Sequence, residues 1–262
     1  MLEKLGVGDR PVDDPATCHL AIEAVKLALA DVQEHVADPD FMHHPPAALL
    51  DRGYLARRAA LIDRHAAADP RHGAPKPGGT VYLAATDADG MMVSYIQSNY
   101  MGFGSGVVVP GTGISLQNRG AGFVLRPGHA NAVGPGKRPF HTIIPGFATT
   151  PDGQPLMAFG LMGGLMQAQG HVQLALRILA YGQNPQAASD APRWRVLGGR
   201  QVAVEPAFPA KTRAALAALG HELILEPLEH HFAFGGSQAI LRVAGGYVAG
   251  SDPRKDGQAV GF

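Results

Sequence analysis

The sequence predicts an α+β fold in which helices enclose two layers of β-sheet. Apolar residues recur at helical spacing before residue 36, whereas past Thr80 they follow the two-residue period of strands separated by turn signals. Helical patterns return after these strands. Helices before and after a set of hairpins fit a four-layer sandwich of helix, sheet, sheet and helix. The order of the strands does not follow from the sequence.

The first predicted helix begins at Asp14-Pro15, where a side chain able to cap the helix precedes proline at the first helical position. Its apolar stripe is formed by Cys18, Ile22, Val25, Leu29, Val32 and Val36. A second helix is expected over residues 47–65. Residues 66–79 are rich first in alanine and then in proline and glycine, which predicts a linker.

Two β-hairpins are predicted after the linker. Their strands are residues 80–86 with 91–99, around Asp87-Ala88-Asp89-Gly90, and 141–150 with 155–162, around Pro151-Asp152-Gly153-Gln154. Helices are expected over 165–181 and over 209–219, the second ending at Gly220. Further strands are expected at 201–205, 221–226, 237–243 and 246–250. These elements complete the predicted sandwich.

Composition excludes several classes of protein. The 262 residues include 22 basic and 22 acidic side chains, so no net field favours nucleic acid or an anionic membrane. Cys18 is the only cysteine, which excludes an internal disulfide or a cysteine-based zinc site. No apolar run reaches the roughly 18 residues of a membrane span, and the N-terminus shows no signal-like segment. A cytoplasmic location is therefore expected.

Thr80 follows the Pro/Gly-rich run 75–79 and opens a β-type segment. A threonine hydroxyl needs a base to become nucleophilic, and its own α-amine, with a pKa of about 7.7 to 8.0, can serve. That amine is free only if the Thr80 hydroxyl attacks the Gly79 carbonyl and the Gly79–Thr80 bond breaks. Adjacent glycines permit the strained backbone that this attack needs. An ordinary loop end before a strand fits the same residues.

Further motifs follow in order along nearly the whole chain. They are His19-Leu20-Ala21-Ile22-Glu23-Ala24, Asp38-Pro39, Asp89-Gly90, Phe103-Gly104-Ser105-Gly106, Gly111-Thr112-Gly113-Ile114, residues 131–139, Met162-Gly163-Gly164 and Ser251-Asp252-Pro253-Arg254. With Thr80 they resemble the C-terminal half of the γ-glutamyltranspeptidase family. The resemblance implies an N-terminal-nucleophile hydrolase, an incomplete four-layer αββα sandwich without a cofactor. Residues 1–79 would end the large subunit, and 80–262 would form the small subunit.

The resemblance also implies catalytic roles. Thr80 would form an acyl-enzyme with a small-molecule amide donor, and water or an amine would then accept the acyl group. Gly163 and Gly164 would supply backbone N–H groups to the oxyanion, although a Gly-Gly turn between strand and helix is an alternative interpretation. Ser98 would orient the nucleophile; otherwise it is a solvent-facing strand serine.

The donor-binding positions depart from the family pattern. Where typical members carry Asn, Gln, Asp and Ser-Ser, this chain has Tyr100, Arg119, Gly122 and His141-Thr142. No carboxylate remains to pair with a donor α-ammonium, and a guanidinium suits a carboxylate instead. The departures resemble the cephalosporin-acylase-like branch, which accepts glutaryl-type amides. Arg119 can equally be interpreted as an exposed loop charge.

Metal and nucleotide sites are not expected. His43-His44 and His230-His231 are adjacent pairs, whose members point to opposite faces of an extended segment, and neither has helical metal-ligand spacing. The glycines at 102, 104 and 106 precede Val107-Val108-Val109-Pro110 instead of a helix, which excludes a dinucleotide loop.

Three functions remain open from the sequence. The first is a self-processing γ-glutamyltransferase or amidohydrolase that cleaves γ-glutamyl or glutaryl-type amides through an acyl-Thr80 intermediate. The second is a catalytically incomplete chain that serves only as a subunit, because the family's N-terminal half, with its donor-binding arginine, is absent. The third is a histidine-dependent hydrolase.

Overall fold

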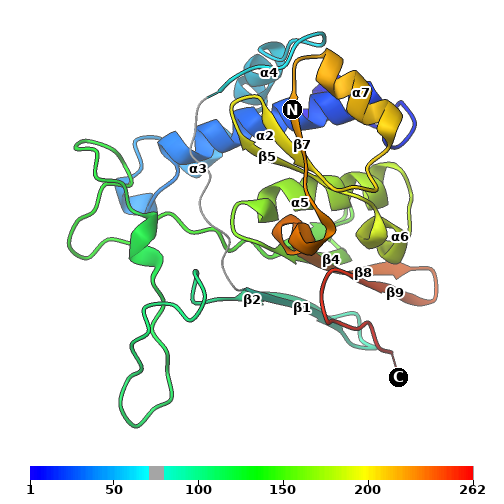
Figure 1. Ribbon diagram of the computed structural model, residues 1–262. Helices are drawn as coiled ribbons and strands as arrows, with labels where there is room; N and C mark the ends of the chain where they lie inside the picture. The colour runs from blue at the N-terminus through cyan, green and yellow to red at the C-terminus, as the bar shows by residue number, and fades with distance from the viewer. Residues whose placement is uncertain (71–79, 262) are drawn as a thin grey trace.

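The computed structural model describes residues 1–70 and 80–261 (Figure 1). Its helices are α1 (Leu2–Leu5), α2 (Pro15–His35), α3 (Pro46–Leu49), α4 (Arg52–Ala60), α5 (Met166–Ala175), α6 (Pro185–Asp190) and α7 (Ala210–Ala218). Short 3-10 turns span Pro39–Phe41, Arg119–Gly122 and Leu228–Phe234, and a π-helical turn, Leu176–Ala180, extends α5. The strands are β1 (Val81–Thr86), β2 (Met92–Gln97), β3 (Gly146–Thr149), β4 (Pro155–Met162), β5 (Trp194–Gly198), β6 (Gln201–Val204), β7 (Glu222–Leu225), β8 (Gly236–Val243) and β9 (Gly246–Ser251).

Two antiparallel sheets pack face to face at the centre of the fold. One is the hairpin β1–β2, and the other has the order β3-β4-β8-β9. The ring of Tyr82 lies so close to Gly160 on β4 that a Cβ there would approach it to 2.2 Å. Only glycine permits this approach of the two sheets. On the opposite face, α5 contacts β4 and α6 contacts β8 and β9, which gives the order helix, sheet, sheet.

A second core joins the N-terminal helix to the C-terminal half of the chain. Asp14 caps α2 by accepting from the amides of Ala16 and Thr17 at 3.0 and 3.2 Å, as predicted. The apolar stripe of α2 packs against β5, β6 and α7 through buried residues that include Ile22, Trp194 and Leu216. Because residues on both sides of the linker share this core, a cut in the linker would leave the two parts joined.

The fourth layer of the sandwich is not present in the described residues. The outer face of β1–β2 exposes a row of apolar side chains, with Val81 61% and Tyr95 46% exposed, and Leu83 and Val93 beside them. Figure 1 shows this face at the edge of the structure, away from the helices. The fold therefore agrees with an incomplete αββα sandwich.

Several predicted elements need correction. The helix expected over 47–65 is two helices, because Asp51 ends the first and caps the second by accepting from the Tyr54 amide at 2.7 Å. Strand β3 begins at Gly146, not 141, since the Ile144 amide donates to the Gln167 side chain at 3.2 Å instead of a strand. Helix α6 and strand β5 were not predicted.

Other expectations hold. The hairpins β1–β2 and β3–β4, the helix after β4, α7, and strands β6 to β9 lie where the patterns placed them. Most of the predicted linker, residues 71–79, lies outside the described residues. In the part of the chain that the structure describes, none of the helices combines the length and the apolar character needed to cross a membrane.

Candidate active site

Thr80 lies immediately before β1, at the edge of the sheet-to-sheet interface. In the β1–β2 register Val81 pairs with Gln97, so the next position of that register sets Thr80 opposite Ser98. Successive strand residues alternate between faces, which puts the half-buried Thr80 on the same inward face as Tyr82. Gly79, the other side of the predicted cleavage bond, lies outside the described residues.

Ser98 is held by two donors. Its Oγ accepts from the backbone N–H of Tyr100 at 2.9 Å and from the Arg119 guanidinium at 2.9 Å. The side chain is half-buried. This arrangement fixes the hydroxyl at the end of β2 that faces Thr80, where a solvent-facing serine would make no such contacts.

Tyr100 adopts a strained backbone. Its φ of 81° lies in the left-handed region that non-glycine residues rarely occupy. The Arg119 guanidinium sits 5.3 Å from the centre of the Tyr100 ring, within the range of a cation–π contact. Backbone strain of this kind persists where the surroundings enforce it, which is common at functional sites.

Arg119 is buried, with only 5% of its surface exposed, so it is not the exposed loop charge that was one alternative. Its guanidinium donates to the Ser98 carbonyl at 3.3 Å and to the Thr142 hydroxyl at 3.4 Å. Burial lowers its pKa, and among the described residues no carboxylate forms an ion pair with it. The site thus holds a desolvated cation without an anionic partner.

His141 and Thr142 complete this group. Thr142 is buried beside Arg119, while His141 lines a pocket of about 660 Å³ together with Ser98 and Arg119. Partial burial, and then the charge of Arg119, lower the pKa of His141. The lowered pKa favours the neutral imidazole, so the charge beside Ser98 is that of Arg119. The pocket is also lined by Arg138, which pairs with Asp38 at 3.1 Å.

Gly122 occupies the position where the family pattern has an acid, and the backbone closes in on it. A Cβ at Gly122 would lie 2.9 Å from the Phe140 carbonyl oxygen. Asn131 holds the two segments together, donating to the Gly122 carbonyl at 2.7 Å and accepting from the Phe140 amide at 2.9 Å. A side chain of any kind here requires the Phe140 segment to move.

A second pocket, of about 470 Å³, opens on the other side of this group. Tyr100, Gly122 and Thr142 line it together with Leu165, the residue that follows Gly164. Three of the positions predicted for donor binding therefore line one cavity with the residue after the Gly-Gly turn, whereas Arg119 and His141 line the first pocket.

Gly163 and Gly164 form the turn between β4 and α5. Their φ values of 130° and 63° both need glycine. Their carbonyls accept from the amides of Met166 and Gln167 at 3.1 and 3.0 Å, which starts the helix. Within residues 1–70 and 80–261, no acceptor takes a hydrogen bond from either glycine N–H. Two free amides at a helix N-terminus can stabilise a developing oxyanion.

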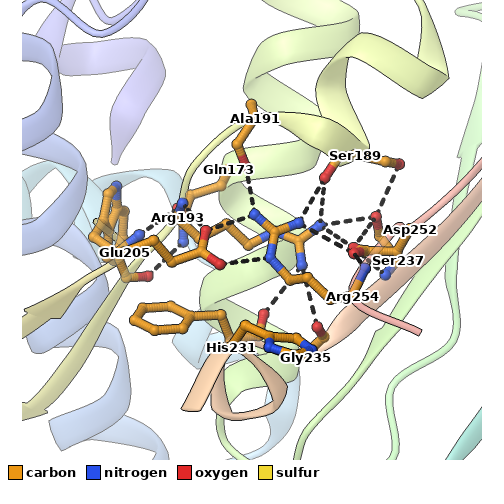
Figure 2. A network of polar contacts seen from close by, with 12 residues as sticks. Gln173, Ser189, Ala191, Arg193, Glu205, His231, Gly235, Ser237, Asp252 and Arg254 are labelled. Atoms are coloured by element: carbon orange, nitrogen blue, oxygen red, sulfur yellow. Dashed lines mark hydrogen bonds and ion pairs between the residues drawn. The ribbon is translucent and has the colours of Figure 1, made fainter. Parts of the chain in front are cut away.

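A buried ionic network, shown in Figure 2, includes Gly235, a residue against which this turn packs. Arg193 donates to the carbonyls of Phe234 and Gly235 at 3.1 and 3.5 Å and pairs with Asp252 at 2.6 Å. The Cα of Gly235 lies 3.4 Å from where a Cβ on Gly163 would be. The network thereby fixes the segment against which the Gly-Gly turn packs.

Arg254 extends the same network to β6. It donates to both oxygens of Glu205, at 2.6 and 2.5 Å, and to Asp252 at 3.1 Å. The sequence motif at 251–254 was recognised only as part of the resemblance, and the roles of Arg193 and Glu205 were missed. The bonds from Arg193 to Phe234 and Asp252, and from Arg254 to Glu205, span 41 to 59 positions, so no local sequence pattern signals them.

The histidine pairs of the sequence are not brought together. His43 contacts the Gly128 carbonyl at 3.3 Å, and His230 pairs with Glu226 at 2.9 Å. A different buried group, His19, Glu23 and His221, places its possible ligand atoms within 4.8 Å of one another.

The contacts of His19, Glu23 and His221 indicate a structural hydrogen-bond network and not a metal site. His19 and His221 bond directly at 2.8 Å, and the buried Lys26 ammonium donates to Glu23 at 2.9 Å, where a cation would repel a metal ion. Burial, and then Lys26 and His19, lower the pKa of His221 to about 3. His19 also bonds the Asp63 carbonyl, and Glu23 accepts from the Ala68 amide. The cluster fixes the segment that leads to the linker.

Comparisons with known proteins identify the family of this chain. A family model described as gamma-glutamyltranspeptidase matches residues 1–262. The oxamate amidohydrolase proenzyme of Klebsiella pneumoniae is 40% identical over 98% of this chain and 50% of its own length. The glutathione hydrolase-like YwrD proenzyme of Bacillus subtilis is 38% identical over 93% of this chain and 47% of its own length.

A solved structure extends the likeness to three dimensions. The cephalosporin acylase from Bacillus halodurans superposes with a TM-score of 0.87 at 49% identity, over 98% of this chain and 48% of that one. The fold is therefore that of the N-terminal-nucleophile hydrolases, present in part. The chain belongs to the γ-glutamyltranspeptidase family, whose members are hydrolases and transferases. It spans about half the length of the curated relatives it matches.

Proposed function

We propose that this chain is the nucleophile-bearing half of a self-processing amidohydrolase that works through an acyl-Thr80 intermediate. The observation that carries the proposal is the meeting of Ser98, Thr142 and the buried Arg119 at the end of the hairpin where Thr80 precedes β1. Relatives named as proenzymes support self-processing. The first half of the family's length would come from the rest of the protein or from a separate chain.

The residues divide the reaction as follows. The Thr80 α-amine, once released from Gly79, takes the proton of the Thr80 hydroxyl. At the same time the hydroxyl oxygen attacks the carbonyl carbon of the donor. The negative charge then passes to the carbonyl oxygen, which the N–H groups of Gly163 and Gly164 stabilise. As the tetrahedral intermediate collapses, the leaving amine takes the proton from the α-ammonium. Water or an amine repeats the sequence to release the acyl group.

The donor preferred by this pocket carries a carboxylate and no ammonium. Arg119 is buried and lacks an anionic partner in the described residues, so a ligand carboxylate would satisfy it. At Gly122 the Phe140 carbonyl occupies the space that an ammonium-binding acid would need. The relative named for oxamate, an amide with a carboxylate and no ammonium, fits such a donor. We therefore favour glutaryl-type amides over γ-glutamyl amides such as glutathione.

A subunit without activity of its own is the second candidate function. The exposed apolar face of β1–β2 and the half-length match to the relatives favour a protein that needs further chain to complete its fold. Self-processing and turnover by this chain alone would exclude this candidate.

Intact-mass analysis of the assembled protein tests self-processing. We expect a light chain that begins at Thr80 and a heavy chain that ends at Gly79, whereas Thr80→Ala should stay whole. An uncut, folded wild-type assembly would contradict the proposal.

Donor kinetics test the preference. We expect kcat/KM to be higher for glutaryl-p-nitroanilide than for γ-glutamyl-p-nitroanilide, and the ratio to fall in Arg119→Ala. A strong γ-glutamyl preference in the wild type, or an unchanged ratio in the variant, would show that other residues read the donor.

A further inference from the structure

The hydrogen bonds around Ser98 determine where its hydroxyl hydrogen can point. A serine hydroxyl has two acceptor lone pairs and one O–H. An amide N–H and a guanidinium can only donate, so Tyr100 and Arg119 occupy both lone pairs of the Ser98 Oγ. The O–H is thus left free to donate, and none of the described residues, Thr80 among them, accepts from it in this structure. Thr80 is the position opposite Ser98 in the strand register.

The charge of Arg119 strengthens this donor. Hydrogen bonds to a charged group are stronger than neutral ones, and successive hydrogen bonds polarise one another. Because Arg119 exposes little surface and forms no ion pair with a carboxylate in the described residues, its charge remains available to polarise Ser98. A polarised Ser98 O–H stabilises negative charge on the Thr80 oxygen as that oxygen loses its proton.

The strain at Tyr100 belongs to the same arrangement. The N–H of this strained residue, with its φ of 81°, donates to the Ser98 Oγ, and the Arg119 guanidinium contacts its ring. Arg119 therefore acts on Ser98 both directly and through Tyr100.

We propose that Arg119 is a positioning residue for the nucleophile, polarising the Ser98 hydroxyl so that it donates to the Thr80 oxygen. This role rests on the proposed function and is additional to reading a donor carboxylate. It predicts that Arg119 matters where no donor carboxylate is present. Self-processing is such a reaction, because the attacked carbonyl belongs to Gly79.

The test compares processing rates of the complete protein in wild type, Arg119→Gln, Ser98→Ala and the double variant. Loss of a charge-assisted hydrogen bond should slow processing about tenfold to hundredfold in Arg119→Gln. In the Ser98→Ala background the same substitution should change the rate less than about twofold, since the two residues act as one unit. Arg119→Lys, which keeps one charged donor, should give an intermediate rate.

A matched control separates this role from a general loss of charge or of folding. Arg200 forms an exposed pair with Glu222 at 3.2 Å and does not contact the described site residues, so Arg200→Gln should process at the wild-type rate. Processed enzyme supplies a second readout with a neutral butyryl anilide, for which Arg119→Gln should lower kcat and leave KM unchanged. If Arg119→Gln does not fold, Arg119→Lys carries the comparison.

Two results would overturn the proposal. One is processing of Arg119→Gln at the wild-type rate, and the other is an equal slowing by Arg119→Gln with and without Ser98. Either would leave the proposed function standing if the wild type still processes at Thr80. Failure of the wild type to process would instead count against the proposed function.

Discussion

Two arginines of this protein each expose little surface but differ in their surroundings. Arg193 lies in the interior, pairs with Asp252 and donates to backbone carbonyls, whereas Arg119 lines a pocket and, among the described residues, its guanidinium contacts hydroxyls, a carbonyl and an aromatic ring. Burying a charge is costly unless an opposite charge or strong hydrogen bonds offset it. Where the protein supplies the counter-charge, the arginine is part of the scaffold. Where it does not, the arginine is available to a ligand or to catalysis.

The largest loss of stability should come from breaking the ion pairs that Asp252 forms with Arg193 and Arg254. Asp252→Ala removes the carboxylate that pairs with Arg193 and Arg254, leaving two buried guanidinium groups with reduced compensation. The free energy of unfolding should fall by about 3 to 5 kcal/mol, as denaturant unfolding would measure.

Arg119→Gln provides the contrast. It removes a buried cation that has no carboxylate partner in the described residues, so we expect the free energy of unfolding to change by less than about 1.5 kcal/mol. If Asp252→Ala and Arg119→Gln destabilised the protein equally, the distinction between a structural Arg193 and a functional Arg119 would be wrong.

The next largest effect concerns the turn that the scaffold supports. At Gly164 a Cβ would meet nothing within 4 Å, but the φ of 63° strains any other residue and a branched side chain would obstruct the approach to the amides. Gly164→Val should lower kcat about 100- to 1,000-fold, the usual cost of losing an oxyanion donor. Ordinary turnover would show that the oxyanion is bound elsewhere.

Protonation of Asp252 by acid should destabilise the protein less than Asp252→Ala does. Burial alone would raise the pKa of Asp252, but Arg193, Arg254 and two backbone amides lower it overall from its ordinary 3.8. A group whose folded-state pKa is lowered contributes stability above the unfolded value, and that stability is lost as the pH falls below about 4. Thermal unfolding of Asp252→Asn should therefore depend less on pH in this range than that of the wild type. Identical slopes would contradict the assignment.

Local patterns predicted much of the fold because local chemistry sets it. The Asp14 cap, the turn at 87–90 and the glycine that ends α7 are short-range signals, and the structure confirms each. The helix break at Asp51 was missed because the apolar pattern continues past a cap that only the side-chain bond to Tyr54 reveals. Helix α6 was missed as well.

For the candidate site, the sequence predicted the identity of the residues but not their contacts. Which residues stand at Ser98, Arg119 and Thr142 followed from the family pattern, but their contact did not, since the bonds span 21 to 23 positions. Burial of Arg119 depends on the loops that close around it, and no local pattern distinguishes it from an exposed loop arginine. The support from Arg193 is longer in range still.

Calorimetric titration of the complete protein with glutarate tests the central claim most directly. If the buried, uncompensated Arg119 is the carboxylate-binding group, glutarate should bind the wild type and bind Arg119→Gln at least about tenfold more weakly. The neutral diamide of glutarate should bind both proteins equally weakly. Equal affinity of wild type and Arg119→Gln for glutarate would contradict the account.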